Sequence, residues 1–255
     1  MPLRIAVAGK GGSGKTTLAA LLCRSLVERG LKPVLAIDAD PNSCLPGRLG
    51  VTVRQTIGQM REEVRDDPES VPQGVSKHAW LEQLIQEDIA EASGFDMLVM
   101  GRQEGPGCYC YLNNILRDNM DRLAKQYRAV IIDNEAGLEH LSRRTNGGVE
   151  ILLIVCPPTQ TGLQTAGRIQ AIIRGLRLEV GTLFLVFNPC DQPPAGELAE
   201  AFGQLGIPVL GAIPLDPLVA SYDVSGKSLL QLPDDSQALR VVQSFVESLA
   251  ERKLL

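Results

Sequence analysis

The stretch GKGGSGKTT at residues 9–17 decides the fold of this chain. It follows the apolar run LRIAVA at residues 3–8, which is typical of a buried strand, and it precedes a helical pattern over residues 18–29 that Gly30 closes. A glycine-rich loop between a strand and a helix lets backbone N–H groups converge on phosphate oxygens. The fixed positions of the pattern G-x-x-x-x-G-K-[ST] are Gly9, Gly14, Lys15 and Thr16. This context favours a nucleotide-phosphate site over an ordinary glycine-rich turn.

Each residue type in the loop suits one part of phosphate binding. The glycines allow close approach of the backbone, and the helix N-terminus favours negative charge. Lys15 is expected to reach the β and γ phosphates, and the Thr16 hydroxyl can ligate Mg²⁺. We therefore expect ATP or ADP with Mg²⁺. The residues expected to hold them are Gly9, Gly11, Gly12, Ser13, Gly14, Lys15, Thr16 and Thr17.

Lys10 is a second lysine in the loop, directly after its first glycine. A lysine here marks the deviant form of the motif, which is found in a distinct group of ATPases. From the mouth of the loop its side chain is suited to phosphates presented by another subunit, like an arginine finger delivered in trans. Lys10 and Lys15 are thus candidate catalytic residues, and an ATP-bridged homodimer is expected. The alternative is that Lys10 is a solvated basic residue that improves the local charge.

Three aspartates follow predicted strands and indicate metal and water chemistry. The apolar run at residues 33–37 leads into Asp38 and Asp40, which strand alternation places on one side, at the carboxyl end of the strand. We assign Asp40 to orienting the attacking water, and Asp38 to the Mg²⁺ shell or to supporting the loop. Asp133 ends the run RAVIID and is expected to hold Mg²⁺ through water. The alternatives are a solvated turn for the first pair and a helix N-cap for Asp133.

The nucleotide base is expected near later strand ends. Asn188 follows the run LFLVF, and its amide can pair with the donor and acceptor edges of adenine. The chain around residues 213–217, including Pro214, can offer backbone groups to the same base. Asparagine before proline also initiates turns, so a turn role for Asn188 stays open.

Apolar runs alternate with helical spacings along the whole chain, which indicates an α/β fold. We predict one single-domain, three-layer P-loop NTPase over residues 1–255, with a mostly parallel central sheet. Residues 51–94 fit this alternation least well, since they are polar and carry the charge cluster REEVRDDPE. They are either a partner-docking insertion or two surface helices. The predicted strands are residues 3–8, 33–37, 95–100, 129–132, 151–156, 182–187 and 209–213, and helices are expected at 18–29, 112–127, 163–176 and 197–205.

The composition excludes several classes of protein. The 255 residues include 25 Lys and Arg against 30 Asp and Glu, a net charge of −5, which argues against a general nucleic-acid or anionic-membrane surface. No signal-peptide pattern or membrane-length apolar run is present, so we expect a cytoplasmic protein. The segment at residues 236–255 is amphipathic, but Glu247 and Glu251 interrupt its basic character. Packing on the sheet is therefore favoured over stable membrane association.

Two of the six cysteines need a separate explanation. Cys108 and Cys110 are separated only by Tyr109 and precede a predicted helix, and a disulfide over so small a ring would be strained. They form a half-site that a twofold axis would double to a Cys₄ site for Zn²⁺, Ni²⁺, Cu⁺ or an iron–sulfur cluster. Lys10 and the cysteine pair each require two facing chains. The alternative is two buried, inert thiols.

Four segments together resemble the CooC-type nickel-insertion ATPases, which mature carbon monoxide dehydrogenase and, in a related branch, acetyl-CoA synthase. These segments are GKGGSGKTT, DADPN at residues 38–42, GCYC at 107–110 and IIDNEAGLEHLSRRT at 131–145. The wider class includes the nitrogenase iron protein and the MinD/ParA positioning ATPases. The resemblance implies ATP hydrolysis by a nucleotide-dependent dimer, with Ni²⁺ or Zn²⁺ held at Cys108 and Cys110 and a nickel enzyme as the client.

A nucleotide-switched positioning ATPase or scaffold with inert cysteines is the alternative function. A positioning ATPase needs a membrane helix or a DNA-binding surface, and neither is evident in the sequence. A nitrogenase-like reductase would need single, widely separated cysteines flanking the second half of the sheet. Cys156 and Cys190 do not reproduce that pattern.

Overall fold

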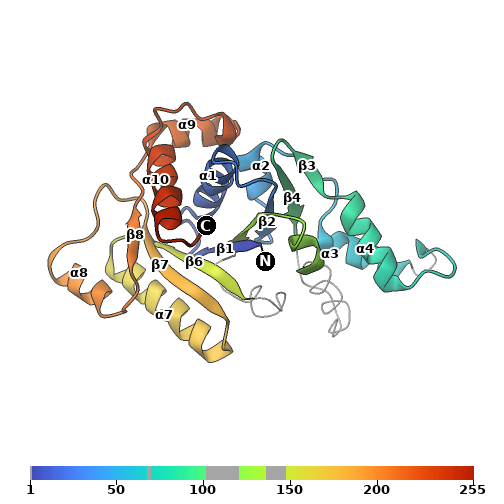
Figure 1. Ribbon diagram of the computed structural model, residues 1–255, viewed down its shortest axis with the longest axis horizontal. Coiled ribbons are helices and arrows are strands. Elements are labelled where there is room, and N and C mark those ends of the chain that lie inside the picture. The colour runs from blue at the N-terminus through green and yellow to red at the C-terminus, as the bar shows by residue number, and fades with distance from the viewer. Residues whose placement is uncertain (1, 68–69, 102–120, 136–147) are drawn as a thin grey trace.

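A central sheet carries the phosphate loop near its middle (Figure 1). The computed structural model describes residues 2–67, 70–101, 121–135 and 148–255. In this part of the chain the sheet has eight strands in the order β3-β4-β2-β5-β1-β6-β7-β8. All neighbours are parallel except β3 and β4. The strands are β1 (Leu3–Gly9), β2 (Val34–Ala39), β3 (Ala90–Ala92), β4 (Phe95–Val99), β5 (Ala129–Asn134), β6 (Val149–Cys156), β7 (Val180–Phe187) and β8 (Val209–Ala212).

The seven predicted strands are confirmed. Most of them are apolar runs that are buried on both faces of a parallel sheet, whereas β8 at the edge is partly exposed. Along β1 the side chains alternate: Ile5 and Val7 enter one core cluster, whereas Ala6 and Ala8 enter the other. The short strand β3 was not predicted. It pairs antiparallel with β4 and forms one edge of the sheet.

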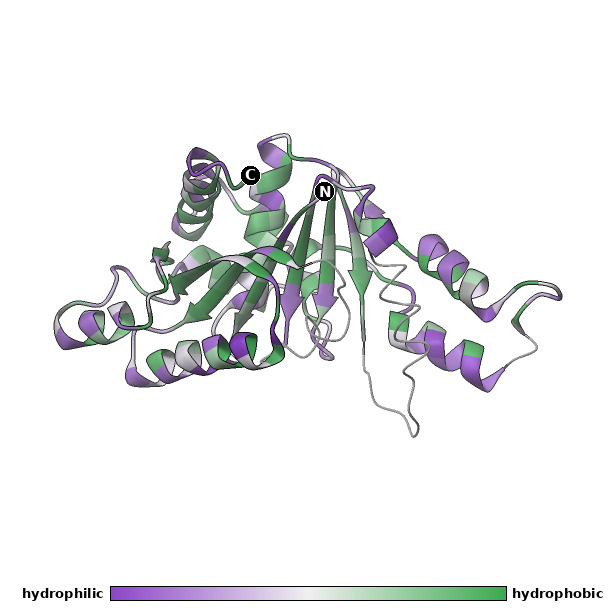
Figure 2. Ribbon diagram, turned by 60° about the horizontal axis from the view of Figure 1, so that its bottom comes forward, coloured by the Kyte–Doolittle hydropathy of each residue, from purple (hydrophilic) through white to green (hydrophobic). Residues whose placement is uncertain are grey.

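Helices cover both faces of the sheet, which confirms the predicted three-layer α/β architecture (Figures 1 and 2). One layer contains α1 (Lys15–Glu28), α2 (Leu45–Leu49), α9 (Pro217–Val224), the 3₁₀ turn η2 (Leu229–Gln231) and α10 (Gln237–Glu251). The other contains α3 (Ile57–Asp66), α4 (Lys77–Glu87), α7 (Gln160–Leu176) and α8 (Gly196–Gly203). The predicted helix at 112–127 is described only from residue 121, where a helical turn covers residues 121–124.

The apolar face of α10 packs against α1, as the amphipathic pattern of this segment predicts. A buried arginine joins α1 to the chain just before α10: Arg24 donates to the Leu232 carbonyl at 2.5 Å and pairs with Asp234 at 3.0 Å. Within α1 it also pairs with Glu28 at 2.6 Å. The side chains of α10 that are buried in this contact are Ala238, Leu239, Val242, Phe245, Val246 and Leu249. None of the described helices is long and apolar enough to cross a membrane.

One buried carboxylate caps two helices. Asp216 accepts from the backbone N–H of Leu218 at the start of α9, at 2.8 Å. Its other oxygen accepts from the Ser236 hydroxyl at 2.6 Å and from the Ala238 N–H at 3.0 Å, at the start of α10. Burial alone would raise the pKa of Asp216, but these hydrogen bonds outweigh it and the pKa is lowered. Asp216 therefore joins the loop after β8 to the C-terminal helix.

The segment 51–94 holds α3, α4 and β3. The two helices pack on each other and extend from the body beyond β4 (Figure 1). Thr56 and Gln59 form a capping box that starts α3, and Ser76 caps α4. The segment therefore contains two helices, and a docking role for it stays a prediction.

Candidate nucleotide site

The phosphate loop connects β1 directly to α1. β1 ends at Gly9 and α1 begins at Lys15, so residues 10–14 form the turn between them. Gly14 precedes the helix in a left-handed conformation, with φ 88°, and it contributes no side-chain cap. The first N–H groups of α1 are thus directed into the loop with no capping side chain from this residue. This arrangement supplies the donors and the helix dipole that an anion requires.

Two positions of the loop require glycine because other atoms lie too close to leave room for a Cβ. A Cβ on Gly9 would lie 2.2 Å from the Val155 carbonyl oxygen of β6. A Cβ on Gly14 would lie 2.1 Å from Nδ2 of Asn188. The same amide donates to the Ser13 carbonyl at 2.7 Å, so Asn188 holds the loop against the end of β7.

The two lysines of the loop occupy different environments. Lys15 is buried at 6 % exposure, and its Nζ donates to the Lys10 carbonyl at 3.3 Å, within the curve of the loop. Lys10 itself is exposed, and its carbonyl also accepts from the Ser13 N–H at 3.2 Å. Lys15 therefore lies where it can serve the nucleotide of its own subunit, whereas the Lys10 side chain is accessible to a second chain.

Asp38 and Asp133 lie side by side on neighbouring strands. They are register partners on β2 and β5, and Asp133 is also the register partner of Val7 on β1. Both carboxylates are almost completely buried, at 0 % and 1 % exposure. The parallel register therefore gathers them at the carboxyl edge of the sheet, beside the phosphate loop, as predicted.

The pKa of the Asp133 carboxylate is strongly raised. Burial raises its pKa to about 7, and the charges of Asp38 and Asp40 add to this rise, while Thr16 and Lys15 oppose it. Neither carboxylate oxygen of Asp133 has a hydrogen-bond partner of ordinary geometry among the described residues, although the Thr16 hydroxyl lies close enough to lower the pKa. A buried carboxylate without partners is costly, so this residue is suited to a cation or to its hydration water.

Asp38 organises the loop that follows β2. Its two oxygens accept from the N–H groups of Asp40 at 2.9 Å and of Leu45 at 2.8 Å. Burial raises its pKa to about 6 despite these hydrogen bonds. Asp38 therefore supports the loop after β2, and a place in the Mg²⁺ shell stays a prediction.

Asp40 points out of this network and is partly exposed. Its Oδ1 accepts from the Asn42 N–H at 2.9 Å and from the Asn42 side-chain amide at 2.8 Å. The solvated-turn geometry is therefore present, and it leaves the other carboxylate oxygen without a recorded partner in the described part of the chain. The assignment of Asp40 to the attacking water stays a prediction.

Asn134 is a residue of the site that the sequence did not single out, whereas Ser13 was expected among the loop residues. Asn134 is fully buried, and its Nδ2 donates to the Val7 carbonyl at 3.0 Å, which ties the end of β5 to β1. Its Oδ1, like the Ser13 hydroxyl, is buried and lacks a partner among the described residues. Both side chains therefore have a polar atom at the site that can still form a hydrogen bond. The position of Asn134 directly after Asp133 was the available signal.

The segments expected to bind the base lie beside each other. The Cys190 N–H donates to the Ile213 carbonyl at 2.7 Å, and the Ile213 N–H donates to the Phe187 carbonyl at 2.8 Å. This pairing places Asn188 and Pro214 on adjacent loops next to the phosphate loop. Contact of either residue with adenine stays a prediction.

The candidate metal ligands Cys108 and Cys110 lie outside the described residues. Within the described ranges no group of three or more His, Cys, Asp or Glu side chains is placed to hold a metal ion. The four cysteines that the structure describes are free thiols, and burial raises the pKa of Cys23 and of Cys156 to about 12. These two thiols are inert components of the core.

Comparison with known proteins identifies the class of this site. The family described as the CobQ/CobB/MinD/ParA nucleotide binding domain matches residues 5–229. The chain belongs to this family. It is a P-loop ATPase of the CobQ/CobB/MinD/ParA type, and the loop, Asp38 and Asp133 lie within the matched residues.

Two relatives extend over nearly the whole chain. An uncharacterized ATP-binding protein of Methanocaldococcus jannaschii is 39% identical over 98% of this chain and 99% of its own length. The carbon monoxide dehydrogenase accessory protein CooC of Rhodospirillum rubrum is 32% identical over 90% of each chain. The resemblance inferred from the motifs is thus confirmed for the CobQ/CobB/MinD/ParA family.

Solved structures confirm the fold. A ParA family ATPase from Chlorobium tepidum superposes with a TM-score of 0.72 at 18% identity and covers 96% of this chain and 98% of its own. The septum site-determining protein MinD of Pyrococcus horikoshii, complexed with Mg-ADP, has a TM-score of 0.69 at 21% identity over 99% of this chain and 98% of its own. ATP or ADP with Mg²⁺ fits this family of P-loop ATPases.

Proposed function

We propose that this ATPase is a metallochaperone that dimerises on binding ATP and assists nickel insertion into carbon monoxide dehydrogenase or acetyl-CoA synthase. The observation that carries the proposal is the relationship to the accessory protein CooC, at 32% identity over 90% of each chain. The pair Cys108 and Cys110 supports it, because two thiolates on each of two chains make a four-ligand site for a thiophilic metal.

The residues at the carboxyl edge of the sheet supply the ATPase part of the proposal. We assign the β and γ phosphates to the loop N–H groups and to Lys15, and Mg²⁺ to Thr16 and Asp133, whose unpartnered oxygens fit a hydrated cation. Bound Mg²⁺ supplies a charge that offsets the negative charge developing on the phosphates. Asp40 orients the water that attacks the γ phosphate. Asp38 fixes the backbone of Asp40 and so positions that carboxylate.

Lys10 provides the link between hydrolysis and dimerisation. Its side chain is exposed at the mouth of the loop, and we assign it to the phosphates bound by the partner subunit. ATP would then stabilise the closed dimer, and loss of the γ phosphate would weaken it. Because the metal site needs both chains, closure assembles it and hydrolysis releases it.

The alternative function is a nucleotide-switched positioning ATPase, and the structure matches support it at the level of the fold. Such a protein would need a membrane-binding helix or a DNA-binding surface. The apolar face of α10, the amphipathic candidate, is instead buried against α1 and the sheet.

Metal content per dimer separates the two functions. Purified protein would be loaded with Ni²⁺ or Zn²⁺, with and without ATP, and the bound metal would be counted in the parent, in the double variant Cys108→Ala/Cys110→Ala and in the control Cys190→Ala. We expect about one metal per dimer in the parent and the control, and loss of that metal in the double variant. Equal metal binding by all three proteins would rule out the metallochaperone.

A further inference from the structure

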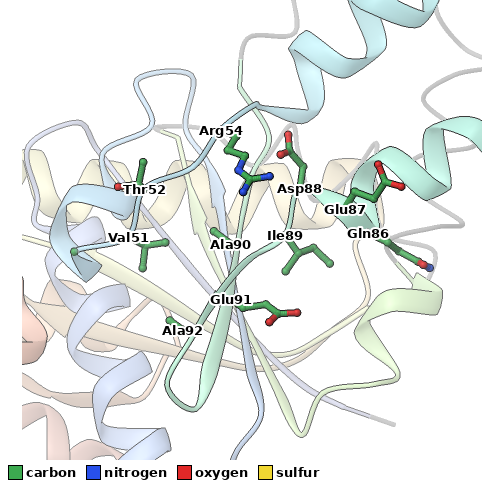
Figure 3. A pocket seen from close by; sticks show the side chains of 11 residues that line it. Val51, Thr52, Arg54, Gln86, Glu87, Asp88, Ile89, Ala90, Glu91 and Ala92 are labelled. Carbon is green, nitrogen blue, oxygen red and sulfur yellow. The ribbon is translucent and has the colours of Figure 1, made fainter. Parts of the chain in front are cut away.

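A cavity of about 470 Å³ opens at the base of the α3 and α4 segment, away from the phosphate loop (Figure 3). Three pieces of chain form it: residues 50–54 before α3, residues 86–88 at the end of α4, and residues 89–92 around β3. Its volume lies in the range of ligand sites, but its walls are mainly polar and charged, unlike the mainly apolar walls of small-molecule pockets. The polar lining therefore suits a peptide, whose backbone N–H and C=O groups can form hydrogen bonds.

One wall of the cavity is the free edge of the sheet. β3 pairs with β4 on one side only and is the terminal strand of the sheet. No recorded backbone hydrogen bond joins residues 89–93 to residues 50–54 across the cavity. An edge strand with free N–H and C=O groups is a template for a further strand.

The charges around this edge are unbalanced. Figure 3 shows Arg54, Asp88 and Glu91 around the cavity, and Glu87 adds a third carboxylate. Arg54 and Glu91 make no ion pair or side-chain hydrogen bond with another described residue, and Oδ2 of Asp88 is buried without a partner among them. Three carboxylates against one guanidinium leave the cavity with an excess negative charge. The carboxylates of the cavity are not grouped closely enough to hold a single metal ion.

We propose that the cavity is a docking site for an extended peptide segment of a partner protein, which adds to β3 as a further strand. A lysine or arginine of that segment pairs with Glu91 and Asp88. The peptide backbone forms hydrogen bonds with the N–H and C=O groups at the free edge of β3, and the basic side chain supplies specificity. A docking role was one of the two alternatives left open for residues 51–94, and this proposal places it on one surface. It depends on neither nickel nor the identity of the client.

Binding can be tested with capped five-residue peptides that have valine and threonine flanks in varied order and lysine, alanine or glutamate at the centre. Their dissociation constants would be measured by calorimetry, and the amides of residues 86–93 would be followed by hydrogen exchange. We expect lysine peptides to bind at micromolar to submillimolar concentration and to protect β3. Glutamate peptides and lysine peptides with N-methylated backbones are expected to bind at least about fivefold more weakly.

Two matched charge reversals complete the test. Glu91→Lys alters the exposed residue of β3, and Glu247→Lys makes the same change in charge on the exposed face of α10. We expect Glu91→Lys to weaken the lysine peptides by about fivefold or more and Glu247→Lys to leave them unchanged. ATP hydrolysis should continue at the parental rate in both variants, so failure here is distinct from failure of the proposed function. Absence of binding by every lysine peptide below about 1 mM, or equal loss in both variants, would overturn the proposal.

Discussion

Asp133 combines burial, negative neighbours and the absence of a described hydrogen-bond partner. Its pKa is raised from 3.8 to about 7, so the folded protein holds a proton that the unfolded chain releases. Stability from this group is therefore fully present below about pH 4 and is lost as the pH rises to about 7. The residue that suits Mg²⁺ best is also one that costs stability at neutral pH without Mg²⁺.

Replacing Asp133 with asparagine should separate its effect on stability from its role in ATP hydrolysis. Without nucleotide and Mg²⁺, we expect Asp133→Asn to be more stable than the parent. The gain in the free energy of unfolding should be roughly 2–3 kcal/mol larger at pH 8 than at pH 5. ATP hydrolysis should fall at least about a hundredfold, since the variant loses a charge assigned to the cation. Urea unfolding at both pH values checks the first effect, with exposed Asp235→Asn as the control. A pH-independent difference between Asp133→Asn and the parent would contradict it.

Gly14 is a loop position where a side chain is poorly tolerated. Its φ is 88°, and an added Cβ would meet the Asn188 amide at 2.1 Å. Gly14→Ala should therefore lower the free energy of unfolding by roughly 2–4 kcal/mol and disrupt ATP binding. Gly11→Ala is the matched control, because nothing lies within 4 Å of its added Cβ and its φ is not positive. Thermal unfolding compares the two, and equal losses would show that close approach is not the cause.

At the scale of elements, Asp216 connects the starts of α9 and α10. Asp216→Ala removes hydrogen bonds to Leu218, Ser236 and Ala238 at once and should destabilise the fold by roughly 2–4 kcal/mol. Because the pKa of Asp216 is lowered, its stabilisation is present at neutral pH and is lost in acid, as the pH falls through the folded pKa. The loss on mutation should therefore shrink at about pH 3. Urea unfolding measures it, and exposed Asp235→Ala should show little loss at either pH.

The elements also show what sequence reasoning can and cannot reach. Long apolar runs predicted seven strands, since strands buried on both faces leave an unambiguous pattern. β3 was missed because its three residues, Ala90, Glu91 and Ala92, are too few to show a strand pattern and form a strand by pairing with β4. Asp38 and Asp133 were predicted separately, but their adjacency depends on the strand order, which the motifs do not contain.

At the scale of the whole molecule, the exposed Lys10 and the buried Lys15 predict different losses on mutation. Lys10→Ala should abolish the ATP-induced dimer and reduce hydrolysis by about a hundredfold or more, while ATP still binds the monomer, because we assign its ammonium to the partner's phosphates. Light scattering coupled to size exclusion, with ATP and Mg²⁺, measures the dimer. Lys32→Ala, at another exposed lysine, is the control. A Lys10→Ala protein that dimerises and hydrolyses ATP like the parent would remove the trans role.

The contact between α1 and α10 has a consequence for biosynthesis. The helix that carries the phosphate loop is complete once residue 28 has been made, but its outer face is covered by residues of η2 and α10, and Arg24 reaches Leu232 and Asp234. This face of α1 is therefore enclosed only after residue 249 has been made. During translation the loop helix stays uncovered over more than 200 residues of synthesis, as the separation of 208 between Arg24 and Leu232 shows. The helix that carries the phosphate loop thus gains its full packing long after its own residues have been made.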